Sequence, residues 1–335
     1  MARSLDEDDV RSRPGRHKSR PRSKDRPTHE TAVVGTVTTV DRGRFTVALD
    51  VGSGRLIHAI KARELGRKGI VVGDRVDLVG DCTGEAGSQA RIIRRAERSS
   101  ALRRTADDAD PIERVIVANA TQLAVVCATT NPSPNLALID RAIVAAIDAG
   151  LRPLLIVTKA DLADPSGVER AYRALSEPPL DLGLFTVAHR SPSAELKNAL
   201  THQTTVMLGE SGVGKSTLVN ALVPGTNRST GDVNLVTGKG RHTSTSVLAL
   251  PLPTGGWIID TPGVRSFGLG NVDRQHVLAG FPEFTVLFAD CPRSCSHDEA
   301  ECALTAWVPG QPVAVQARVR SLRRLLGTLN ERGFD

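Results

Sequence analysis

The sequence Gly209-Glu-Ser-Gly-Val-Gly-Lys-Ser216 follows an apolar run at 205–208 and opens a segment with helical periodicity at 215–223. It fits the pattern G-x-x-x-x-G-K-[S/T], in which backbone N–H groups surround phosphate oxygens. The start of the following helix adds partial positive charge. Lys215 then reaches the terminal phosphates and the Ser216 hydroxyl ligates Mg²⁺. The residues expected to bind a nucleoside triphosphate are Gly209, Glu210, Ser211, Gly212, Val213, Gly214, Lys215, Ser216 and Thr217.

The segments around this loop alternate apolar strands with helical periods. The expected strands are 123–128, 154–158, 184–187, 205–208 and 256–260, and the expected helices are 138–149, 193–200 and 215–223. This alternation is typical of a parallel sheet whose two faces are both covered by helices. We therefore expect an α/β domain around the loop.

The tetrapeptide Asp260-Thr-Pro-Gly263 stands at the end of the last expected strand, about 45 residues after the phosphate loop. A carboxylate at that position holds Mg²⁺ through water. We expect the N–H of Gly263 to meet the γ-phosphate. The pattern D-x-x-G is weak alone, and its place after a phosphate loop makes it informative.

The tetrapeptide Thr158-Lys-Ala-Asp161 ends another expected strand. An ionised Asp only accepts hydrogen bonds, so Asp161 suits the N1–H and 2-amino donors of guanine. Adenine has a lone pair in place of N1–H and would be repelled. The stem of Lys159 lies along the base plane, and the backbone N–H of Ala188, at the end of a further strand, is expected to meet guanine O6. Thr158, Lys159, Ala160, Asp161 and Ala188 thus form the expected base site.

Together these motifs resemble the P-loop, switch II and guanine-specificity motifs of GTPases, but the base motif precedes the P-loop. A circularly permuted GTPase domain has this order. With a strand-rich N-terminal region, the sequence Gly240-Arg-His-Thr-Ser-Thr245 and a Cys/His cluster, the chain resembles the ribosome small-subunit-dependent GTPase A (RsgA) family over roughly residues 31–305. The resemblance implies hydrolysis of GTP to GDP and phosphate in late maturation of the small (30S) ribosomal subunit, with rRNA contacts and subunit-stimulated turnover.

Two positions depart from the usual GTPase pattern. Thr158 stands where the base motif usually has Asn, so a contact to the base or the P-loop is lost or changed. We expect lower affinity with base selection retained through Asp161. Val264 stands where many GTPases have a Gln that orients water, which an apolar side chain cannot do.

The resemblance implies that the family shares this apolar position, and His242 is the candidate replacement. His242 either takes part in hydrolysis beside Lys215 or only packs in switch I. One hydroxyl of 243–245 is expected to complete the Mg²⁺ shell with Ser216 and Asp260, and Thr245 is favoured.

The cluster Cys291-x₃-Cys295-x-His297-x₄-Cys302 supplies three thiolates and one imidazole within 12 residues. Four such ligands suit tetrahedral Zn²⁺, and a closed Cys₃His set makes the site structural rather than catalytic. The family resemblance also implies zinc, although the family's usual spacing is one residue longer in two of the gaps. An unligated reduced cluster and a disulfide are the alternatives.

Residues 31–100 contain short β-branched or alternating runs separated by glycines. The expected strands are 31–40, 44–50, 55–60, 75–79 and 90–93. Several short strands in so few residues suggest a small closed barrel such as an OB-fold. A basic stretch follows at 91–104, and it is either a solvated loop or a phosphate-contacting surface.

The formal charge of +6 is unevenly spread, because residues 11–26 carry eight Lys or Arg against one Asp. Residues 1–30 have almost no apolar side chains, so we expect a disordered arm. It is either a solubilising tail or an electrostatic arm for nucleic acid. Because aromatic residues make up only 3%, nucleic-acid binding should rest on charge and shape more than on base stacking.

No apolar run reaches about 18 residues, the length that spans a bilayer, and the N-terminus lacks an apolar core. We expect a cytoplasmic protein with reduced thiols and no membrane partner. The expected partners are GTP or GDP and the small ribosomal subunit with its rRNA, and we expect a monomer. The alternatives are an RNA-binding module that only senses GTP, and an ATP-using P-loop enzyme, against which Asp161 argues.

The expected fold is multidomain α/β plus β. It comprises a basic arm at 1–30, an OB-like β-barrel at 31–105, a circularly permuted P-loop GTPase domain at 106–270 and a C-terminal zinc-binding helical domain at 271–335. The GTPase domain is a parallel sheet with helices on both faces. The last domain carries an expected helix at 313–331 with four arginines that can meet phosphates: Arg318, Arg320, Arg323 and Arg324.

Overall fold

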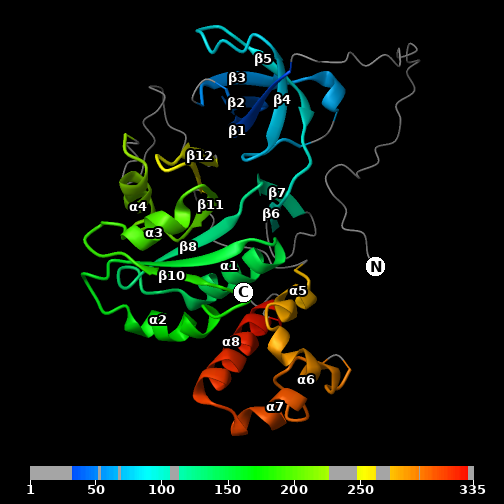
Figure 1. Cartoon of the computed structure of the whole chain (residues 1–335), viewed down its shortest axis with the longest axis vertical. Helices are drawn as coiled ribbons and strands as arrows, with labels where there is room; N and C mark the ends of the chain where they lie inside the picture. The colour runs from blue at the N-terminus through cyan, green and yellow to red at the C-terminus, as the bar shows by residue number, and fades with distance from the viewer. Residues whose placement is uncertain are drawn as a thin grey trace.

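The computed structural model describes residues 32–51, 54–66, 69–105, 113–225, 247–261, 272–293 and 295–330. Figure 1 shows three parts in chain order: a β-barrel at the top, a sheet with helices in the middle and a group of short helices with one long helix at the bottom. The basic arm lies outside the described residues.

The first part is a closed five-stranded barrel. Its strands are β1 (Val33–Asp41), β2 (Arg44–Leu49), β3 (Leu56–Lys61), β4 (Arg75–Gly80) and β5 (Ala90–Arg95). They pair in the order β1-β2-β3-β5-β4, and β4 returns to β1. Alternate side chains such as Val37, Val47 and Ile92 fill the interior and are fully buried. The expected barrel is confirmed, and the short 3₁₀ helix η2 (Arg63–Leu65) follows β3.

The middle part is a sheet in the order β10-β9-β8-β11-β13-β12. Its strands are β8 (Gln122–Ala128), β9 (Arg152–Thr158), β10 (Gly183–Thr186), β11 (Gln203–Leu208), β12 (Leu248–Pro251) and β13 (Gly256–Asp260). All neighbours are parallel except β12 with β13. The strands are almost wholly buried, as expected for a parallel sheet covered on both faces.

Helices cover the two faces with separate apolar cores. One core joins α1 (Leu136–Asp148), the 3₁₀ helix η3 (Arg173–Leu175) and the long helix α8 (Val313–Asn330). The other joins α3 (Ala194–Leu200) and α4 (Lys215–Leu222). The helix α2 (Ser166–Tyr172) precedes η3 on the α1 side. Every parallel strand ends at the same edge, so the loops after β9, β11 and β13 meet there.

The barrel and the sheet are joined by an antiparallel pair that the sequence had not suggested, β6 (Ala101–Thr105) with β7 (Glu113–Ala118). Val72 of the barrel bridges to Val117 of β7. Thr39 of β1 pairs with Leu248 of β12, so the barrel also continues the sheet.

The C-terminal part consists of short helices followed by one long helix. The elements are α5 (Arg274–Ala279), η4 (Pro282–Phe284), α6 (Thr285–Ala289), α7 (Ala303–Trp307), η5 (Val308–Gly310) and α8. The long helix packs against α1 and η3. Among the described residues, no helix combines the length and apolar character needed to cross a membrane.

Most of the basic residues at 91–104 and 318–324 have partners within the protein, and contact of this region with phosphates stays a prediction. Arg98 pairs with the fully buried Asp74 at 2.7 Å. Arg318 donates to the carbonyl of Ala174 at 2.9 Å. Buried arginines of this kind satisfy carbonyls and carboxylates inside the fold. Arg94, Arg95, Arg323 and Arg324 also have partners in the chain, while Arg91 and Arg320 are exposed.

Candidate functional site

The phosphate loop lies between β11 and α4, as expected. Gly212 and Gly214 have φ of +83° and +91°, a region that glycine adopts without steric cost. Gly214 is the N-cap of α4, so the free N–H groups of the first turn face the loop. A Cβ at Gly209 would lie 2.6 Å from the carbonyl oxygen of Val126. The backbone therefore has a conformation that suits the predicted anion-binding turn at the start of a helix.

Two charged groups of the predicted site form a buried pair. The Nζ of Lys215 lies 2.7 Å from Oδ1 of Asp260, and it donates to the carbonyl of Thr261 at 3.0 Å. Their side chains are 11% and 3% exposed. Asp260 ends β13 beside the first turn of α4, so the carboxylate, the ammonium and the hydroxyl-bearing Ser216 belong to one corner of the sheet edge.

Thr158, the residue that departs from the usual base motif, contacts the phosphate loop directly. Its buried hydroxyl lies within hydrogen-bonding distance of the carbonyl of Val213 and 3.1 Å from that of Cys127. A threonine hydroxyl has one proton to donate. A single O–H therefore ties the end of β9 to the phosphate loop, and the contact that the sequence expected to be lost or changed is retained in altered form.

Asp161 is fixed by the loop after β10. The backbone N–H of His189 donates to Oδ1 of Asp161 at 2.9 Å. This hydrogen bond lowers the pKa of Asp161 below its ordinary value, so the carboxylate is ionised at neutral pH and accepts hydrogen bonds only. Ala160 N–H donates to the carbonyl of Val187 at 3.2 Å. The segments carrying Asp161 and Ala188 therefore lie together.

The sequence did not predict that the connection between β8 and α1 contacts the candidate site. Thr129 donates from Oγ1 to the carbonyl of Lys159 at 2.7 Å, and the ammonium of Lys159 donates to the carbonyl of Asn131. The carboxamide of Asn135 donates to Oε1 of Glu210 at 2.9 Å. A cluster of polar residues after a buried strand, Thr-Thr-Asn-Pro-Ser-Pro-Asn, was the available signal.

Cys291, Cys295, His297 and Cys302 meet as predicted, with their ligand atoms all within 4.8 Å of one another. Cys291 Sγ lies 3.6 Å from Cys302 Sγ and 3.5 Å from His297 Nδ1, and Cys302 Sγ lies 3.9 Å from Nδ1. A tetrahedron with Zn–S near 2.3 Å and Zn–N near 2.0 Å has edges of about 3.5–3.8 Å. The sulfurs are too far apart for a disulfide, and the arrangement is a Cys₃His metal-binding cluster.

The surroundings of the cluster shift the pKa values of two of its four residues. Burial, with Arg274 and Arg323 nearby, lowers the pKa of His297, which keeps the imidazole neutral as a ligand must be. Burial and the carboxylate of Glu299 raise the pKa of Cys295 to about 12. A coordinated dication deprotonates such a thiol. Metal binding at this cluster therefore releases a proton.

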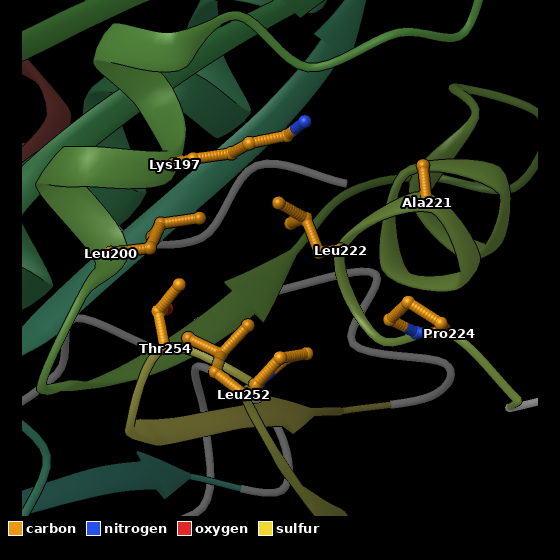
Figure 2. Close-up of a pocket in the computed structure, with 8 residues that line it drawn as sticks. Lys197, Leu200, Ala221, Leu222, Pro224, Leu252 and Thr254 are labelled. Atoms are coloured by element: carbon orange, nitrogen blue, oxygen red, sulfur yellow. The ribbon is translucent and has the colours of Figure 1, made fainter.

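The remaining predicted residues, His242, Thr245 and Gly263, lie outside the described residues, as does Val264. Elsewhere, a cavity of about 210 Å³ opens between α3, the end of α4 and the turn after β12. Leu200, Leu222 and Leu252 point into it (Figure 2). None of the predicted site residues lines this cavity, so it is distinct from the phosphate site.

A glycine-rich phosphate loop after β11, an acidic residue after the earlier strand β9 that is predicted to read the base, and a parallel sheet joining them define a circularly permuted P-loop nucleotide-binding protein. The family model described as RsgA GTPase matches residues 95–270. The small ribosomal subunit biogenesis GTPase RsgA of Pseudomonas aeruginosa (strain LESB58) is 39% identical over 275 residues, covering 79% of this chain and 77% of the relative. The RsgA of Ectopseudomonas mendocina (strain ymp) is 41% identical over 249 residues, covering 72% and 70%. The chain therefore belongs to the RsgA family and is a GTP hydrolase.

Two solved structures share the fold. YjeQ from Thermotoga maritima has a TM-score of 0.62 and 24% identity, covering 90% of this chain and all of that one. YloQ, described as a circularly permuted GTPase, has a TM-score of 0.62 and 21% identity, covering 93% of this chain and all of that one. Both likenesses extend over the barrel, the permuted domain and the C-terminal helices.

Proposed function

We propose that this chain hydrolyses GTP during late maturation of the small ribosomal subunit, with rRNA contacts and stimulation by the subunit. The observation that carries the nucleotide chemistry is the hydroxyl of Thr158, which holds the base-reading segment against the phosphate loop. The subunit role rests on the relatives, which are named small ribosomal subunit biogenesis GTPases.

The proposed roles belong to residues of the loops at the carboxyl edge of the sheet. Asp161 reads guanine with Thr158, Lys159, Ala160 and Ala188 around the base, and 209–217 holds the phosphates. The ionised Asp161 supports this assignment, because it offers only acceptors to the two guanine donors. Lys215 stabilises charge on the transferred phosphoryl group. His242 is proposed to take part in hydrolysis, and Gly263 to donate its N–H to the γ-phosphate.

Mg²⁺ is proposed to bind with the nucleotide through Ser216, Thr245 and Asp260. Hydroxyl and carboxylate oxygens are the donors that this cation prefers, and Asp260 is a buried carboxylate already paired with a positive group, Lys215. When bound, Mg²⁺ neutralises charge on the β- and γ-phosphates. Lys215 must leave Asp260 to reach those phosphates, so the buried pair is expected to rearrange on binding.

Zinc is proposed as the metal of the Cys₃His cluster, where it would hold the loop 291–302 closed. We propose the boundaries 31–105, 106–270 and 271–335 for the barrel, the GTPase and the zinc-binding domains. A cytoplasmic monomer is proposed, with a basic arm at 1–30.

Zinc content by metal analysis should be one per chain, and Cys302→Ser should abolish it.

Base selection has a direct test in Asp161→Asn. The carboxamide places a donor where guanine also has a donor, so GDP affinity should fall by at least about 100-fold, since two charge-assisted hydrogen bonds are lost. Xanthine carries a carbonyl in place of the 2-amino group, so the variant should prefer xanthosine diphosphate. Titrations of both diphosphates measure the change. Unchanged GDP affinity would remove Asp161 from the base site.

The proposed cellular role is tested by GTP turnover titrated with purified small subunits. Turnover should be slow alone and rise with subunit concentration, because no glutamine follows Gly263 and a partner can order switch segments. Ser216→Ala is the better inactive control, since Lys215→Ala also strips the buried Asp260 of its counter-ion. A GTP turnover rate that does not change when small subunits are added would overturn the ribosomal role and leave the nucleotide site intact.

A further inference from the structure

We propose that Asn135 is a positioning residue of the nucleotide site, which acts by holding Glu210 of the phosphate loop away from the bound phosphates. The inference rests on the proposed nucleotide site. Asn135 is the N-cap of α1, and no expected site motif contains it. Its partner Glu210 is the second residue of the phosphate loop, 75 positions further along the chain.

Both ends of the Asn135 carboxamide are engaged. Its Oδ1 accepts from the N–H of Leu138 at 3.1 Å, which caps α1. Its Nδ2 donates to Oε1 of Glu210 at 2.9 Å. The cap fixes the plane of the amide, so its donor is directed at Glu210. Serine and aspartate also cap helices well, but an ionised aspartate has no donor, and the O–H of serine lies on a side chain too short to replace the carboxamide N–H at Glu210.

The acidic Glu210 needs such a partner. A carboxylate within an anion-binding loop repels phosphate, since like charges a few ångströms apart interact unfavourably. At the start of α1 the same carboxylate meets the positive end of a helix and the Asn135 amide. The contact therefore stabilises a position of Glu210 that leaves the loop N–H groups available to phosphate.

The connection that ends at Asn135 also holds the base-reading segment. The N–H of Thr129 donates to the carbonyl of Thr158 at 3.0 Å, and the hydroxyl of Thr129 donates to the carbonyl of Lys159. Lys159 has φ of +58°, a conformation that needs outside support in a lysine, and its ammonium binds the Asn131 carbonyl. One short connection thus touches the base-reading segment at one end and the phosphate loop at the other.

The test compares Asn135→Ser and Asn135→Asp with the unmodified protein in binding of GDP and of guanosine. Both variants keep an N-cap and lose the donor to Glu210. We expect Asn135→Ser to weaken GDP binding about three- to fivefold, the size of one exposed charge-assisted hydrogen bond. Asn135→Asp should weaken it further, because it adds a second carboxylate. Guanosine affinity should not change in either variant, and the unfolding midpoint of Asn135→Ser without nucleotide should change little.

A second background separates positioning from general disruption. In Glu210→Ala there is no carboxylate to hold aside, so adding Asn135→Ser should change GDP affinity less than twofold. In turnover, Asn135→Ser should raise KM with kcat little changed. Equal GDP affinity of Asn135→Ser and the unmodified protein overturns the proposal. So does a loss that persists in Glu210→Ala, or a parallel loss for guanosine. Failure of the unmodified protein to bind GDP would instead overturn the proposed function, and this inference with it.

Discussion

At the residue scale, Thr158 explains how this chain tolerates the loss of the usual asparagine. The hydroxyl is buried between the ends of β8 and β9 and the phosphate loop, and it meets the carbonyls of Cys127 and Val213. A β-branched side chain has few rotamers, so the hydroxyl is held in place at little entropic cost. One strong contact replaces the two or more that a carboxamide can make.

Thr158→Val tests this account because valine keeps the shape and removes the O–H. We expect the free energy of unfolding to fall by about 1–2 kcal/mol, the cost of a lost buried hydrogen bond, and GDP affinity to fall about tenfold. Thr158→Ser keeps the hydroxyl and serves as the matched control. Denaturant titration and GDP titration provide the measurements. Equal affinities for the two variants would mean that the hydroxyl does not position the loop.

At the scale of elements, the joint between barrel and sheet depends on a turn that only glycine fits. Gly73 has φ of +89°, and a Cβ there would lie 2.0 Å from the carbonyl oxygen of Ala118. The side chain of Asn119 donates to the carbonyl of Gly73 at 2.9 Å. The next residue, Asp74, is fully buried and paired with Arg98. The turn before β4 is therefore locked to the end of β7.

Gly73→Ala should destabilise the protein more than Gly87→Ala, although both glycines have φ of +89°. Nothing lies within 4 Å of a Cβ at Gly87, so that variant carries only the backbone cost of about 1 kcal/mol. Gly73→Ala adds a clash with backbone, worth about 1–3 kcal/mol more. Chemical denaturation of both variants gives the difference. Equal free energies of unfolding for Gly73→Ala and Gly87→Ala would show that the backbone around Gly73 can shift to accept a Cβ without a measurable loss of stability.

At the scale of the whole molecule, local sequence patterns predicted most strands and helices. Features that depend on contacts between residues far apart in the sequence were not predicted. Alternation and apolar runs predicted the barrel strands and the parallel sheet, because their burial follows one period. The pair β6 and β7 was missed because charged residues interrupt its alternation. Asn135 was missed because its role depends on Glu210, which no local pattern connects to it.

The arginines of α8 also show the limit of prediction from local sequence patterns. The sequence suggests a basic surface, but Arg318 and Arg324 are directed at the segments that cover the GTPase sheet, while Arg320 is exposed. Arg324 donates to Oδ1 of Asp140 at 2.9 Å and lies over the Tyr172 ring at 4.5 Å. Its neighbour Arg323 donates to the carbonyl of His297 in the metal-binding cluster at 2.8 Å. Through α8 the cluster is therefore tied to α1, the helix that begins at Asn135.

Arg324→Ala should loosen this attachment, because it removes the guanidinium that pairs with the buried Asp140. We expect a loss of about 2–4 kcal/mol, at the lower part of the range for a broken buried pair, since Arg324 is 31% exposed. Arg320→Ala, on the same helix but exposed, should cost little. Adding Asp140→Asn to Arg324→Ala should recover part of the loss by removing the uncompensated charge. Hydrogen exchange along α8 and denaturant titration measure both effects. If Arg324→Ala and Arg320→Ala unfold at the same denaturant concentration, α8 is held by its apolar face alone.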